Sequence, residues 1–297
     1  MIQNVRQSKL LHETSCRIIS NISVAAAKAD FYISPIEPFC VLLDLIQRDS
    51  TTTSLQKEAC SAIYALMSYS EDEIEAELLQ PVSFCLFGSI LEENKAALDS
   101  DSIEICEGGL RIIDLIAERM MKGSHELSFS PDQIETLVSL AFAAFEFDVS
   151  CECLIVYIMG IFQSLSSREN TKEMLVEGGC IITVIDALHI FSEHIDMQIV
   201  GIGILARLCD NSLQVQFACV ESDGIEAILS GMARFQTNGD IQASACRALA
   251  HLTIDEDAQE RMSSAGGLGI IAKAKEIFLE NGDLQRDATH LLKWLME

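Results

Sequence analysis

Proline and aromatic residues are scarce in this sequence. Its 297 residues include only 4 Pro and one Trp, and aromatic residues make up 6% of the chain. β-Sandwiches and barrels need frequent turns and many aromatic cross-strand pairs, so this scarcity favours a helical protein. With 49% hydrophobic residues, the chain has enough apolar material for a large buried core.

Positive charge is also in short supply. Forty-five Asp and Glu residues outnumber 20 Lys and Arg residues, which gives a net charge of −25 at pH 7. Nucleic-acid phosphates and anionic lipids would be repelled, so we expect no nucleic acid and no membrane as a partner. The excess of carboxylates serves to keep an apolar-rich chain in solution, and a basic partner on the acidic outer surface is the alternative interpretation.

The sequence has no apolar run long enough to cross a bilayer and no secretory leader. Its longest apolar segment, residues 153–162, is about half of the ~20 residues that a spanning helix needs. The N-terminal residues lack the basic region and apolar stretch of a signal peptide. We therefore expect a cytoplasmic protein, with entry into the nucleus left open.

Motifs that would carry chemistry are missing. The 11 cysteines contain no Cys-x-x-Cys unit and are expected to be reduced core residues, Cys16, Cys60 and Cys246 among them. Glycine-rich matches at 201–206 and 267–272 lack the preceding strand of a dinucleotide site. The sequence therefore predicts no catalytic residues, no metal site and no cofactor, and a protein that is not an enzyme.

A repeat organises the chain. Similar segments begin at Asp196, Asp240 and Asp283, 44 and 43 residues apart, and each has a glutamine two residues later, followed by apolar residues at helical spacing. The same pattern extends towards the N-terminus. It predicts seven equivalent helices, over residues 12–22, 56–66, 105–115, 155–165, 198–208, 242–252 and 285–295.

Small and large apolar residues form two columns in these helices, as stacked helices require. Two more helical stretches lie between successive members, and glycines mark the corner between them at Gly178-Gly179, Gly224 and Gly266-Gly267. A unit of three helices is longer than an ankyrin or tetratricopeptide repeat and has the length of armadillo and HEAT repeats.

Residues 169–179 and 257–267 resemble the first helix and corner of the armadillo family, and residues 242–252 resemble its third helix. The resemblance implies an all-α fold, a right-handed α-solenoid of about six three-helix armadillo/HEAT-like repeats plus a partial N-terminal one. It would form a single domain over residues 1–297. The repeats are clearest over 165–297 and irregular over 97–130, where armadillo and HEAT geometry both remain open.

In armadillo proteins the third helices line a concave groove. The resemblance implies that the fifth and ninth residues after the first residue of each of the seven predicted helices, its anchor, face this groove. Further towards the N-terminus these positions include Leu110 and Asp114. The C-terminal groove positions are basic or aromatic, namely Arg207, Arg247, His251, His290 and Trp294.

Guanidinium and indole groups suit an extended peptide that carries carboxylates. We therefore predict a non-catalytic protein–protein interaction scaffold or adaptor that binds an extended partner segment in the groove. In one alternative, these side chains are ordinary polar residues on exposed helix faces. In another, the chain is a structural or assembly subunit that associates through exposed solenoid ends.

Overall fold

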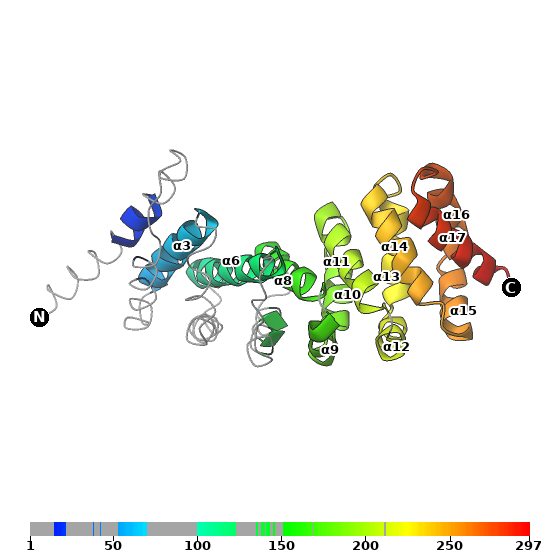
Figure 1. The fold of residues 1–297 in the computed structure, drawn as a ribbon, viewed down its shortest axis with the longest axis horizontal. Helices are drawn as coiled ribbons and strands as arrows, with labels where there is room; N and C mark the ends of the chain where they lie inside the picture. Colours follow the sequence, from blue (N-terminus) through cyan, green and yellow to red (C-terminus); the bar gives the residue numbers. More distant parts are fainter. Residues whose placement is uncertain are drawn as a thin grey trace, which may run out of the picture. The chain divides into compact units, whose positions relative to one another are not determined.

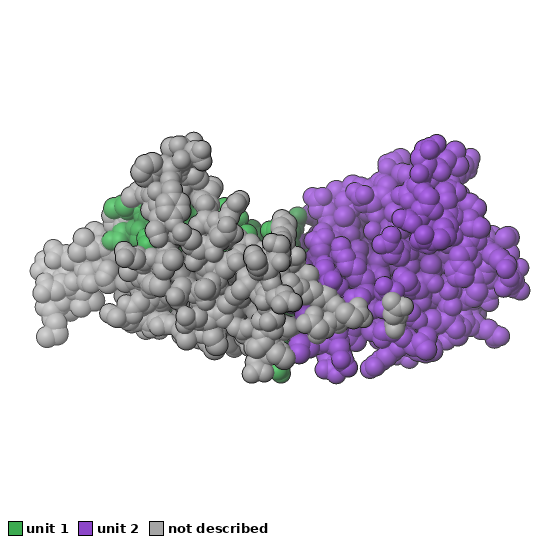
Figure 2. All heavy atoms as spheres, in the orientation of Figure 1, with its two compact units in different colours: residues 1–161 green, residues 162–297 purple. Residues whose placement is uncertain are grey.

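The computed structural model describes residues 15–21, 53–69, 100–122, 151–167, 169–210 and 212–297, with a few single positions between 38 and 145. Within these residues all regular structure is helical, which confirms the all-α part of the predicted fold class (Figure 1). The chain falls into two compact units, residues 1–161 (unit 1) and residues 162–297 (unit 2) (Figure 2). One continuous repeat domain and its number of repeats stay predictions.

Unit 2 repeats one short helix and two longer ones. The short first helices are α9 (Glu169–Glu177), α12 (Leu213–Glu221) and α15 (Glu256–Ser264). The second helices are α10 (Cys180–Ile190), α13 (Gly224–Arg234) and α16 (Gly267–Ile277). The third helices are α11 (Ile195–Leu208), α14 (Gly239–His251) and α17 (Gly282–Leu295), and they pack in that order (Figure 1).

Unit 1 contains α3 (Thr53–Tyr69), α6 (Ser100–Lys122) and the part of α8 (Glu152–Leu165) up to Ile161. Helices α3 and α6 pack against each other. These helices cover the predicted segments 56–66, 105–115 and 155–165. Of the predicted segment 12–22, residues 15–21 are described, and they are helical.

The corner between first and second helices depends on one residue with positive φ. This residue is Gly179 (φ 91°), Asp223 (φ 62°) or Gly266 (φ 78°). In the middle repeat, the expectation that Gly224 supplies the permissive backbone is therefore wrong. Gly224 is needed for space instead, because a Cβ atom there would lie 2.6 Å from the carbonyl oxygen of Cys219.

The glutamine that begins each third helix secures the end of the preceding second helix. Gln242 Nε2 donates to the carbonyl oxygens of Met232 (2.9 Å) and Phe235 (3.2 Å). Gln198 and Gln285 bond in the same way to carbonyls ten and seven residues earlier. Because the last carbonyls of a helix have no partner within it, these amides replace water where the repeat is buried.

The third helices bury the small and large apolar residues that form the two columns in the sequence. Small Ala245 and large Leu249 of α14 are both fully buried. Cys16, Cys60 and Cys246 are also buried, which confirms their predicted place on the packed side of their helices. No helix among the described residues is both long and apolar enough to span a bilayer.

Candidate functional site

The third helices of unit 2 carry the predicted groove residues on one face. Since α14 packs against both α11 and α17, residues at equal offsets from Gln198, Gln242 and Gln285 project from neighbouring helices. We call this face the unit 2 strip and define it by Arg207, Arg247, His251, His290 and Trp294.

Arg207 and Arg247 are brought together by α11 and α14. Arg247 is exposed and Arg207 is half-buried. Burial lowers the pKa of the Arg207 guanidinium, and the neighbouring charge of Arg247 lowers it further. The Nη1 atom of Arg207 is buried and has no hydrogen-bond partner among the described residues. Two cations therefore act on each other without an ion pair to any carboxylate of the described residues.

The other described arginines of unit 2 all have acidic partners. Arg234 pairs with Glu193. Arg286 Nη1 lies 2.9 Å from Asp283 Oδ1, and Arg261 Nη1 lies 3.0 Å from Asp223 Oδ1. In the described part of this unit, only the two arginines of the strip lack an ion pair with a carboxylate.

The remaining residues of the strip make local contacts. His251 Nε2 lies 4.0 Å from Asp210 Oδ1, and His290 Nε2 lies 3.3 Å from Thr253 Oγ1. Trp294 is half-buried, and its main-chain carbonyl accepts a hydrogen bond of 2.6 Å from Gln259 Nε2. Among the described residues, Arg207 and Arg247 thus influence each other electrostatically, and the Trp294 indole makes no hydrogen bond or ion pair with the other four side chains.

In unit 1 the structure corrects the register of α6. The order of buried and more exposed positions along α6 matches that along α14 when Cys106, and not Ile105, is aligned with Gln242. Leu110 is consequently buried, and Arg111 takes the position that corresponds to Arg247. The assignment of Leu110 to the groove is therefore wrong.

Two pairs of identical neighbouring residues explain why the sequence could not reveal this one-residue difference in register. Gly108-Gly109 satisfies the small column in either register, and Ile112-Ile113 satisfies the large column in either register. Only the packing of α6 in the structure distinguishes the two registers. Arg111 was missed for this reason, and its flanking aromatic residues Tyr64 and Tyr157 gave no separate signal.

Arg111 is stacked against aromatic rings from two other helices. Its Cζ atom lies 4.2 Å from the centre of the Tyr64 ring on α3 and 5.8 Å from that of Tyr157 on α8. Its Nε atom is buried without a hydrogen-bond partner among the residues described. Nearby, Asp114 presses its carboxyl group against Gly160, where a Cβ atom would lie 2.8 Å from Asp114 Cγ.

Comparison with known proteins supports the fold. No protein-family model and no curated protein matches the sequence. The structure is similar to a solved chain from work on a conserved phosphorylation switch that controls the interaction between cadherin and beta-catenin, with a TM-score of 0.67 and 16% identity. The fold is armadillo-like. The likeness covers 94% of this chain, which spans about half, 48%, of that chain.

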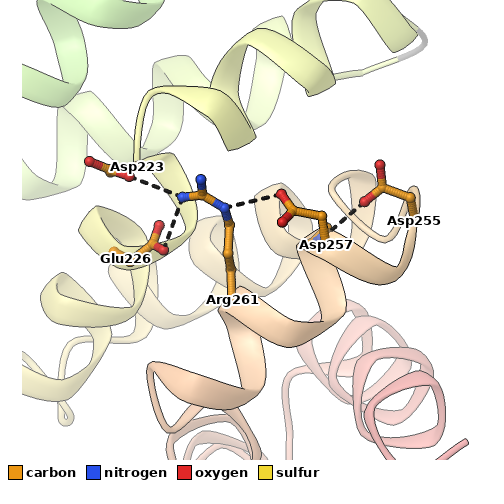
Figure 3. Close-up of polar contacts among 6 residues, drawn as sticks. Asp223, Glu226, Asp255, Asp257 and Arg261 are labelled. Carbon is orange, nitrogen blue, oxygen red and sulfur yellow. Dashed lines mark hydrogen bonds and ion pairs between the residues drawn. The ribbon is translucent and has the colours of Figure 1, made fainter.

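A second polar cluster joins two of the armadillo-like repeats. Figure 3 shows Arg261 of α15 between Asp223 and Glu226 on one side and Asp257 on the other. Arg261 Nη1 lies 3.4 Å from Glu226 Oε1, and Arg261 Nε lies 3.1 Å from Asp257 Oδ2. Because the guanidinium bonds to all three carboxylates, the cluster ties α15 to the preceding corner and neutralises the charge of Arg261 within the protein.

A pocket of about 230 Å³ lies between the second helices α13 and α16 of the armadillo-like array. Its lining includes Met232, Ile270, Ile277 and Lys273. The amide of Gln242, which also lines it, is already bonded to two carbonyl oxygens. The described residues contain no group of His, Cys, Asp or Glu placed to hold a metal ion. The unit 2 strip is the better candidate site.

Proposed function

We propose that the chain is a protein-binding scaffold whose unit 2 strip binds an extended, acidic segment of another protein. The observation that carries the proposal is the pair formed by Arg207 and Arg247. In a chain with a net charge of −25, two arginines on the packed neighbours α11 and α14 act on each other electrostatically and have no ion pair among the described residues. Carboxylates of a ligand would supply the missing countercharge and an acceptor for Arg207 Nη1.

The spacing of the helices suits an extended ligand. Packed helices lie about 8–10 Å apart, and an extended peptide covers that distance in about three residues. An acidic residue at every third position could therefore meet successive third helices. The acidic remainder of the surface repels such a segment, so binding would be confined to the strip.

The structural likeness supports a protein as the partner. The similar solved chain comes from work on the interaction between cadherin and beta-catenin, which is a contact between two proteins. Repeat solenoids in general offer long continuous surfaces for such contacts. No catalytic role is included in the proposal.

The test is a binding measurement with a fluorescently labelled peptide that carries glutamate at every third position. We expect Arg207→Glu combined with Arg247→Glu to raise the Kd about 100-fold or more, since each charge-assisted contact contributes about 1.5–3 kcal/mol. Fluorescence anisotropy gives the Kd. A peptide with glutamine in place of each glutamate should bind far more weakly to the wild-type protein.

A matched control uses Arg234→Glu combined with Arg286→Glu. These two arginines lie in the same unit outside the strip and are paired with carboxylates, so the control introduces the same change in net charge. It should leave the Kd nearly unchanged. Equal loss in both double variants would show that only the overall charge matters, and the proposal would fail.

The outer face of the last repeat supports a second candidate, assembly through the end of the solenoid. Leu279 and Met296 are 70% and 71% exposed. Leu268 is exposed, whereas its counterparts Ile181 and Ile225 in the preceding repeats are buried. Under this candidate, Leu279→Glu with Met296→Glu would abolish association measured by analytical ultracentrifugation, and the arginine variants would not.

A further inference from the structure

Unit 1 contains an arginine, Arg111, that like the strip arginines forms no ion pair with a carboxylate among the described residues. Among all described arginine side chains, Arg17 is paired with Glu58 at 2.7 Å, and those of unit 2 outside the strip are paired as well. Arg111, Arg207 and Arg247 form no ion pair with a carboxylate among the described residues, although the charge of Glu107, one turn earlier on α6, acts on Arg111. All three lie on the same face of third helices, as the corrected register of α6 shows.

Unsatisfied donors point to the same residues. Among the described side chains, three buried polar atoms have no hydrogen-bond partner, and two of them are Arg111 Nε and Arg207 Nη1. A buried donor without an acceptor costs about 1–3 kcal/mol. Such a donor needs an acceptor from bound water or from a ligand, so the two atoms mark places where an acceptor could bind.

The tyrosines determine which acceptor fits. The ring of Tyr64 covers the Arg111 guanidinium at 4.2 Å, and Tyr157 approaches it at 5.8 Å from another helix. Burial lowers the pKa of Arg111, but a side-chain hydrogen bond with Tyr64 and the charge of Glu107 raise it overall. One hydrogen bond to Tyr64 leaves further N–H groups at the edge of the guanidinium, which carries five. A planar carboxylate can approach that edge and accept two parallel hydrogen bonds. The half-buried rings also offer apolar surface to the residue beside the carboxylate.

We infer that Arg111, held by Tyr64 and Tyr157, forms a second binding site in unit 1 for an acidic side chain of a protein segment. The site is separate from the unit 2 strip and does not depend on it. If Arg111 only bridged helices, its stack on the tyrosines would suffice, and no ligand would be needed at its Nε atom.

Arginine side-chain NMR tests the site in the full-length protein. In a ¹⁵N-labelled sample, the Nε–Hε signal of Arg111 is assigned by its loss in Arg111→Lys. The probe is an acetylated eight-residue peptide with a Glu-Phe-Glu core, and the control probe has a Gln-Phe-Gln core. We expect the Arg111 signal to shift saturably with the first peptide and at least about tenfold more weakly with the second.

Substitution of the aromatic wall gives a matched pair of variants. Tyr157→Phe keeps the ring and should leave the peptide Kd at Arg111 unchanged. Tyr157→Leu removes the ring and should weaken binding about two- to fivefold, as expected for a partly exposed cation–π contact. The backbone amide spectrum verifies that both variants are folded.

The inference is overturned if the Arg111 signal stays fixed at millimolar peptide, or if it shifts equally with both peptides. The signals of Arg207 and Arg247 in the same spectra report on the unit 2 strip. Failure at Arg111 with a response at Arg207 and Arg247 would therefore disprove only the second site. A response at Arg111 alone would support the second site and contradict the strip.

Discussion

At the scale of single residues, Asp114 has an unusual environment in unit 1. Its carboxyl group lies against Gly160 of α8 and is largely withdrawn from water. Burial raises the pKa of Asp114 from 3.8 to about 7, and the nearby charge of Glu118 contributes to the increase. The folded protein therefore holds this proton more tightly than the unfolded chain.

The sign of the resulting pH dependence follows from that difference. Well below pH 4 the group is protonated in both states and has no effect on stability. Between pH 4 and 7 the unfolded chain loses this proton while the folded state keeps it, so stability falls as the pH rises, and the loss is complete above about pH 7. We expect Asp114→Asn to be more stable than wild type by on the order of 1–3 kcal/mol at pH 8 and by less at pH 5. Urea unfolding from pH 5 to 8 measures this difference.

Glu118→Gln is the control for Asp114→Asn. Glu118 is exposed and acts on Asp114 only through its charge, so its removal should reduce the pH effect without abolishing it. A stability difference between Asp114→Asn and wild type that is constant over the whole pH range would contradict the assignment.

At the scale of helices, the anchor glutamines explain how each repeat holds its second and third helices together. Gln242 is almost fully buried, and its amide satisfies two carbonyl oxygens at the end of α13. The sequence shows the glutamines in register. Their partners are backbone atoms, which no side-chain pattern displays, so this role became visible only in the structure.

Replacing Gln242 by methionine keeps the length of the side chain but leaves two buried carbonyls without a donor. We expect a loss of about 1–3 kcal/mol in the free energy of unfolding. Gln236→Met is the matched control, because the half-buried Gln236 bonds only to the nearby carbonyl of Ala233. Urea unfolding of both variants gives the comparison, and equal stability losses would show that the glutamine contact is unimportant.

At the scale of the whole molecule, the net charge of −25 opposes folding by self-repulsion. Salt screens this repulsion, so we expect the Tm to rise as NaCl increases from about 20 to 300 mM. The same salt should weaken peptide binding to the unit 2 strip, where opposite charges attract. Thermal unfolding measures the Tm and anisotropy measures the peptide Kd on the same protein sample. A salt increase that stabilised the protein and also tightened peptide binding would contradict this expectation.

The sequence by itself determined the helical class, the place of the third helices and their buried columns. Apolar spacing within a helix is a local property, and each of the described third helices confirms it. Local patterns were ambiguous where neighbouring residues were identical. Gly108-Gly109 and Ile112-Ile113 fit two registers, and packing alone placed Arg111 rather than Leu110 on the open face of α6.

Only the tertiary structure decided which arginines form ion pairs with carboxylates. Arg234 meets Glu193 from 41 residues away, and Arg261 meets Asp223 from 38 residues away. Such pairs form between adjacent repeats, and spacing along one helix does not reveal them. Arg207, Arg247 and Arg111 are distinguished by the lack of such a partner among the described residues. That distinction depends on which side chains the stacked repeats bring within reach.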